Sequence, residues 1–68
     1  MNEEALNMSI RKFLKKVGVT SQREIEHAVH EALAAGKIPG DAVLKAKVVL
    51  TVEGVGLSTS VESDIELE

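Results

Sequence analysis

Two histidines and three glutamates within eight residues are the side chains best suited to metal binding or acid–base chemistry. His27 and His30 are three residues apart in a predicted helix, with Glu24, Glu26 and Glu31 close by. The pattern is not the H-E-x-x-H motif of zinc hydrolases, and no third ligand is specified elsewhere. We therefore expect a solvated helix surface without a metal or cofactor, with weak adventitious zinc or nickel binding as the alternative. The predicted i,i+4 pairs on this surface are His27–Glu31 and Glu26–His30.

Nucleophilic catalysis would need a hydroxyl or thiol beside a base in a shielded pocket. The chain has no cysteine, and Ser58, Ser60 and Ser63 lie in a predicted strand with no histidine near them. Gly54 and Gly56 do not form a phosphate loop, because no helix begins after them. We therefore predict no catalytic residues and expect that the protein is not an enzyme.

A cluster of cations offers binding chemistry instead. Half of the eight Lys and Arg residues lie within six positions of the first predicted helix: Arg11, Lys12, Lys15 and Lys16. One interpretation is a solvated face whose charges complement the dipole at the end of that helix. The other is a patch that binds an acidic protein or a nucleic acid. We favour an acidic protein partner.

The segment 17–36 resembles the start of a recognition helix in helix-turn-helix proteins, because a short turn and a Ser-x-x-Glu signal precede a periodic helix. A hairpin then follows, as in the wing of a winged helix. However, its exposed face would set Arg23 against three glutamates, and the net charge is −3. DNA phosphates would repel that face. A nucleic-acid-binding protein of degenerate winged-helix type therefore stays the alternative function.

The elements that position these residues follow from hydrophobic periodicity. Apolar residues recur at helical spacing over about 3–17, with Asn2 as the N-cap and Gly18 as the stop. A second helix is predicted over about 22–35, where Ser21 and Glu24 form a capping box and Gly36 follows the last turn.

After Pro39 the period changes from 3.6 to 2, which predicts strands over about 44–53 and 57–67. A two-residue turn at Gly54 and Val55 pairs Val48 with Val61 and places both apolar sets on one face. The same register pairs Lys47 with Glu62 and Lys45 with Asp64, as favourable cross-strand pairing requires. Two independent patterns thus select one register.

The predicted fold is a single α+β domain over 1–68 with the order α-α-β-β, in which two helices pack on one face of an antiparallel β-hairpin. The predicted core residues are Leu6, Ile10, Phe13, Ile25, Val29, Leu33, Val48, Leu50, Val61 and Ile65.

A two-stranded hairpin is marginal in water, so one free strand edge is a candidate for self-association. The second strand carries a row of acids that would repel its own copy. The first strand pairs with itself about Val49. The candidate dimer edge is Lys45, Lys47, Val49, Thr51 and Glu53, with a monomer as the alternative.

Composition limits the class of protein. With 44% hydrophobic and 28% charged residues, the chain is globular rather than disordered, and Phe13 is its one aromatic residue. The N-terminus has acids where a signal peptide has positive charges, and no apolar run has the roughly 18 residues of a transmembrane helix. We expect a cytoplasmic protein that contacts no membrane. The final Leu67-Glu68 is either native or a purification-tag scar.

Residues 7–26, NMSIRKFLKKVGVTSQREIE, together with the GVGL hairpin and the acidic C-terminal run, resemble a family of short bacterial proteins of about this length. That family carries only the description of a domain of unknown function. The resemblance implies a stand-alone bacterial protein and no activity, cofactor or catalytic residue. We therefore predict a non-enzymatic protein–protein interaction module.

Overall fold

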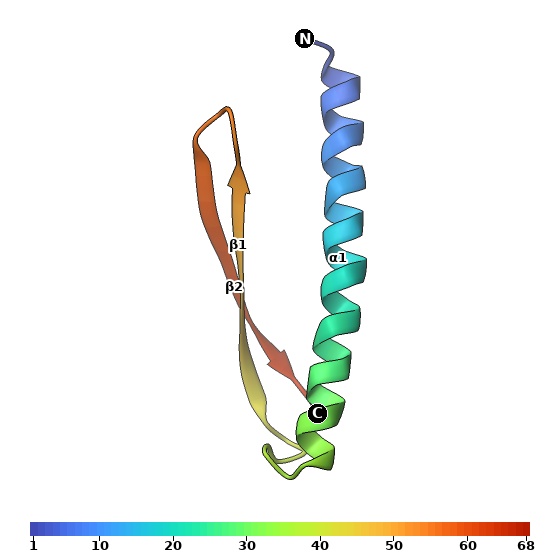
Figure 1. Ribbon diagram of the computed structural model, residues 1–68, viewed down its shortest axis with the longest axis vertical. Helices are drawn as coiled ribbons and strands as arrows, with labels where there is room; N and C mark the ends of the chain where they lie inside the picture. The colour runs from blue at the N-terminus through green and yellow to red at the C-terminus, as the bar shows by residue number, and fades with distance from the viewer. The chain divides into compact units, whose positions relative to one another are not determined.

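The computed structural model describes residues 1–68 as one helix followed by an antiparallel β-hairpin. The helix is α1 (Glu3–Ala34), and the strands are β1 (Val43–Val52) and β2 (Leu57–Glu66) (Figure 1). The chain divides into two compact units, Met1–Lys37 and Ile38–Glu68. The α+β class is confirmed. The predicted order α-α-β-β is wrong, because the order is α-β-β.

The two predicted helices, 3–17 and 22–35, are one continuous helix of 32 residues (Figure 1). Gly18 does not stop it, since the glycines with positive φ are elsewhere. A glycine inside a helix costs only about 1 kcal/mol relative to alanine, whereas proline costs about 3 kcal/mol. The one proline of the chain is Pro39, beyond the helix. Ser21 therefore lies inside α1 and caps nothing.

The apolar residues explain why the helix continues. Val17 precedes the predicted break and Ile25 follows it. Ser21 lies four residues from each of them, and a step of four residues is the spacing of one helical face. Val17 and Ser21 are half-buried. Each step of four residues turns about 40° around a helix with 3.6 residues per turn, so the apolar stripe shifts gradually around α1 without being interrupted.

The outer ends of α1 follow the predicted signals. The Asn2 side chain accepts hydrogen bonds from the backbone N–H groups of Glu4 (2.9 Å) and Ala5 (3.1 Å). At the other end Gly36 takes φ 70°, a left-handed conformation that favours glycine. Its N–H and that of Lys37 donate to helix carbonyls at 3.1 and 2.9 Å, the pattern of a Schellman motif.

The hairpin register is confirmed. Lys45 pairs with Asp64, Lys47 with Glu62 and Val48 with Val61. The loop has four residues, 53–56, rather than two, and Gly54 and Gly56 take φ values of 90° and 66°. A positive φ at Gly56 leaves the extended region, so the ladder ends at the Val52–Leu57 pair.

Neither unit buries a side chain of its own. Val29, Leu50 and Ile65 are half-buried, while the other seven predicted core residues are exposed. One helix and one two-stranded sheet each present a single apolar face, and neither element can cover its own face. Phe13, for example, is 48% exposed.

Candidate functional site

The histidines form part of an open helix surface. His27 Nε2 lies 3.4 Å from Glu31 Oε1, as predicted, and both side chains are more than 70% exposed. The predicted Glu26–His30 pair is absent, and Glu26 accepts a hydrogen bond from Gln22 Nε2 at 2.9 Å. The structure contains no group of three or more potential metal-ligating side chains.

The serines considered for nucleophilic catalysis lie on β2 and are exposed. Ser63 Oγ donates to the backbone oxygen of the adjacent Asp64 at 3.5 Å. Ser60 pairs with Val49 and Ser58 with Thr51 across the hairpin. The register therefore places neither of these two hydroxyls opposite a base.

The cations Arg11, Lys12, Lys15 and Lys16, here called the basic patch, lie together on α1 and are all exposed. None of them makes a salt bridge, whereas His27 and Lys47 do. Helix geometry explains this, because no carboxylate stands three or four residues from any patch member. The patch instead contains like-charged neighbours at i,i+4, such as Lys12 and Lys16.

The position of the basic patch differs from the one predicted. Lys16 was expected in the last turn of a helix, but it lies 18 residues before Ala34, the last residue of α1. The helix dipole acts within about one turn of a terminus. The dipole therefore cannot account for these charges.

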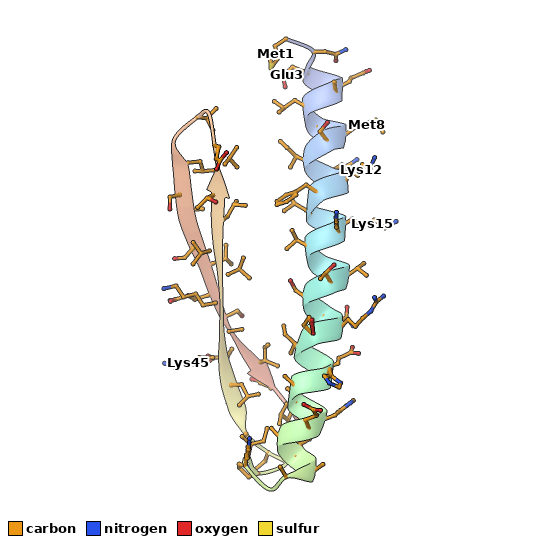
Figure 2. All side chains as sticks on the ribbon, viewed as in Figure 1. Met1, Glu3, Met8, Lys12, Lys15 and Lys45 are labelled. Carbon is orange, nitrogen blue, oxygen red and sulfur yellow. The ribbon has the colours of Figure 1, made fainter.

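Beside the basic patch lies a methionine, Met8, that was not predicted from the sequence. Met8, Ser9, Arg11, Lys12 and Lys15 line one open surface of α1. Met8 is 72% exposed and projects from the same side of the helix as Lys12 and Lys15 (Figure 2). Its spacing of three, four and seven residues from Arg11, Lys12 and Lys15 is the signal that could have identified it.

The candidate dimer edge lies mainly on β1. Lys45, Lys47, Val49 and Thr51 belong to the strand, while Glu53 is the first loop residue. Lys47 Nζ lies 4.0 Å from Glu62 Oε1 across the hairpin. Val49 is 63% exposed. The sheet has two strands, so the outer edge of β1 has no strand beside it.

The predicted helix-turn-helix corner does not exist, because 17–21 is helical. No helix of the structure has the length and apolarity that a membrane span requires.

Together these features define a small α+β protein with one long amphipathic helix and a β-hairpin. Residues 1–68 match the model of a family of unknown function, DUF6494, and the chain belongs to that family. The resemblance found in the sequence is thereby confirmed. No curated protein matches the chain, and no solved structure matches it.

Proposed function

We propose that the protein is a non-enzymatic interaction module whose basic patch binds an acidic surface of a partner protein. The observation that carries this proposal is the position of four exposed cations in the interior of one helix without an ion-pairing partner. Exposed Met8 adds an apolar contact within the same surface. An acidic surface with one apolar contact point would complement it.

The energetics of the helix favour the same conclusion. Like charges at i,i+4 destabilise a helix by about 0.2–0.5 kcal/mol per pair. Arg11–Lys15 and Lys12–Lys16 are two such pairs. A partner carboxylate would turn this repulsion into charge-assisted hydrogen bonds, which are stronger than those between neutral groups. Because the patch is exposed, the interaction should weaken as salt rises.

The proposal of a non-enzymatic role is supported by exposure. No polar or charged side chain of the chain is buried. Catalytic groups are most effective where water is excluded and the local dielectric constant is low. A binding surface has no such requirement, since it becomes shielded when the partner arrives.

A quantitative pull-down from a native lysate, with wild type and two charge variants as bait, tests the proposal. The patch variant carries Arg11→Gln, Lys12→Gln, Lys15→Gln and Lys16→Gln. The matched control carries the four other cations changed in the same way: Arg23→Gln, Lys37→Gln, Lys45→Gln and Lys47→Gln. We expect an acidic protein that wild type and control retain, that the patch variant loses, and that salt releases. Equal retention by both variants would contradict the proposal.

The nucleic-acid alternative has its own measurement. Fluorescence anisotropy with random duplex DNA at low salt should show no binding at micromolar protein. Binding whose log K falls with log salt at about −0.9 per phosphate contact would favour the alternative. If the patch variant then lost that binding, nucleic acid would replace the acidic protein as the partner.

We also propose self-association through β1, which would extend the sheet to the order 2-1-1′-2′. The register leaves Val49 at the centre of a free edge, with 63% of its surface exposed. Antiparallel pairing about Val49 sets Lys47 against Thr51 of the second copy. Glu62, Asp64 and Glu66 make the edge of β2 self-repelling. Val49→Pro removes a backbone donor, so it should abolish this contact, as light scattering coupled to size exclusion would show.

A further inference from the structure

We propose that two copies of the chain pair antiparallel through the apolar stripe of α1, with a two-fold axis at the level of Val19. The stripe consists of Leu6, Ile10, Phe13, Val17, Ser21, Ile25, Ala28 and Ala32. This contact goes beyond the proposed function, since it uses the side of α1 away from Arg11, Lys12 and Lys15 and shares only Lys16 with the basic patch.

The spacing along the stripe is the same from either end. Successive members are four, three, four, four, four, three and four residues apart. A reversed copy of the helix therefore matches it level for level. Leu6 meets Ala32 of the second copy, and Ile10 meets Ala28. Near the axis, Phe13 meets Ile25 and Val17 meets Ser21.

The sizes of the paired residues are complementary. The larger side chains stand in the N-terminal half, where Leu6, Ile10 and Phe13 are 45%, 47% and 48% exposed. The C-terminal half offers Ala28 and Ala32, so antiparallel pairing sets Leu6 and Ile10 against alanines. A parallel pair would crowd Phe13 against its own copy and leave voids between the alanines. Close packing without voids therefore favours the antiparallel arrangement.

Charge selects the same direction. A parallel pair would align the basic patches of the two copies. In the antiparallel pair, residues 11–16 lie level with residues 22–27, where Glu24 and Glu26 outnumber Arg23. Lys16 and Glu24 flank the stripe on the same side, about 3 Å apart along the axis at 1.5 Å per residue. The two-fold axis generates this pair twice.

Cysteine cross-linking tests the pairing, because the chain has no cysteine of its own. An equimolar mixture of Leu6→Cys and Ala32→Cys chains should form a disulfide-linked heterodimer under mild oxidation. Leu6→Cys alone should not cross-link, because its two copies would be about 39 Å apart, from 26 residues at 1.5 Å each. Ile10→Cys with Ala28→Cys repeats the test if either first variant loses its helical circular dichroism.

The matched control is Met8→Cys mixed with His30→Cys. These two residues share a level in the antiparallel pair but project from the far side of α1, so no heterodimer should form. Equal cross-linking of this control, or homodimers of Leu6→Cys, would overturn the proposal. So would absence of the heterodimer, the result expected if the hairpin of the same chain or another protein covers the stripe.

Mass in solution completes the test and separates this contact from the β1 edge. At roughly 100 μM the Val49→Pro variant, which lacks the β1 contact, should have twice the 7.3 kDa mass of one chain. The wild-type protein should have at least that mass, and more where the β1 edges also pair. A 7.3 kDa species in either protein would overturn the helix pairing.

Discussion

Replacing Gly18 with alanine distinguishes the continuous helix from two helices joined by a turn. In the structure Gly18 lies inside α1 without a positive φ, and a Cβ built there meets no atom within 4 Å. Alanine has a higher helix propensity than glycine, and it adds no clash here. Gly18→Ala should therefore stabilise the protein.

The expected gain is about 1 kcal/mol, the difference between glycine and alanine in a helix interior. Part of that gain comes from the unfolded chain, because glycine loses more backbone entropy on folding. For a chain of this size, 1 kcal/mol corresponds to an increase in Tm of about 4–8 °C. If Gly18 instead ended a helix in the left-handed conformation, alanine would cost about 1–2 kcal/mol. The continuous helix and the helix that ends at Gly18 thus predict opposite signs for the change in stability caused by Gly18→Ala.

Thermal unfolding followed by circular dichroism at 222 nm measures this difference at one fixed protein concentration. Gly36→Ala is the matched control, because Gly36 has φ 70° and open space around its Cβ position. It should lower Tm, since alanine is strained at that φ. If Gly18→Ala lowered Tm as Gly36→Ala does, the single helix would be wrong.

Three further changes test local features. Asn2→Ala should lower helix stability by about 1 kcal/mol, because two N–H groups lose their acceptor, and thermal unfolding would show it. Gly56→Ala should destabilise the hairpin by about 1 kcal/mol through strain at φ 66°, seen as faster amide hydrogen exchange in both strands. Lys47→Glu places a like charge opposite Glu62, and because both side chains are exposed, urea unfolding should show a loss below about 1 kcal/mol.

The hairpin could be predicted from sequence because independent constraints agree on it. Alternating apolar residues require one face, and a shift of one residue would move them all to the other. The pairing of Lys47 with Glu62 and of Lys45 with Asp64 selects the same alignment. For the hairpin, only the predicted loop length was wrong. The alternation of apolar and polar residues does not reveal that Gly56 takes a positive φ.

The prediction of a break in the helix was wrong because signals near Gly18 were given more weight than the continuity of the apolar face along the helix. Gly18 and the Ser21–Glu24 capping box are the signals of a stop and a start. Each of them also fits inside a helix at a cost of about 1 kcal/mol or less. The steps from Val17 to Ile25 kept the apolar face continuous, and this longer-range pattern agrees with the structure.

The core could not be predicted as buried because sequence identifies apolar faces and not what covers them. The predicted core combined the apolar face of the helical segments with that of the hairpin. This prediction assumed that two helices would pack on the hairpin and cover both faces. With one helix, Phe13 and Val61 are 48% and 63% exposed. Each unit therefore exposes part of its apolar face.

The finding of one helix in place of two also changes the interpretation of the basic patch. Placed at a helix end, Lys15 and Lys16 would stabilise the fold through the dipole and need no partner. In the interior of α1 they repel Arg11 and Lys12 instead, and no carboxylate of the helix is within reach. Local stability therefore no longer explains the patch, which is why we propose that it binds an acidic partner. A binding role was predicted from residue types, but its main support comes from the length of the helix.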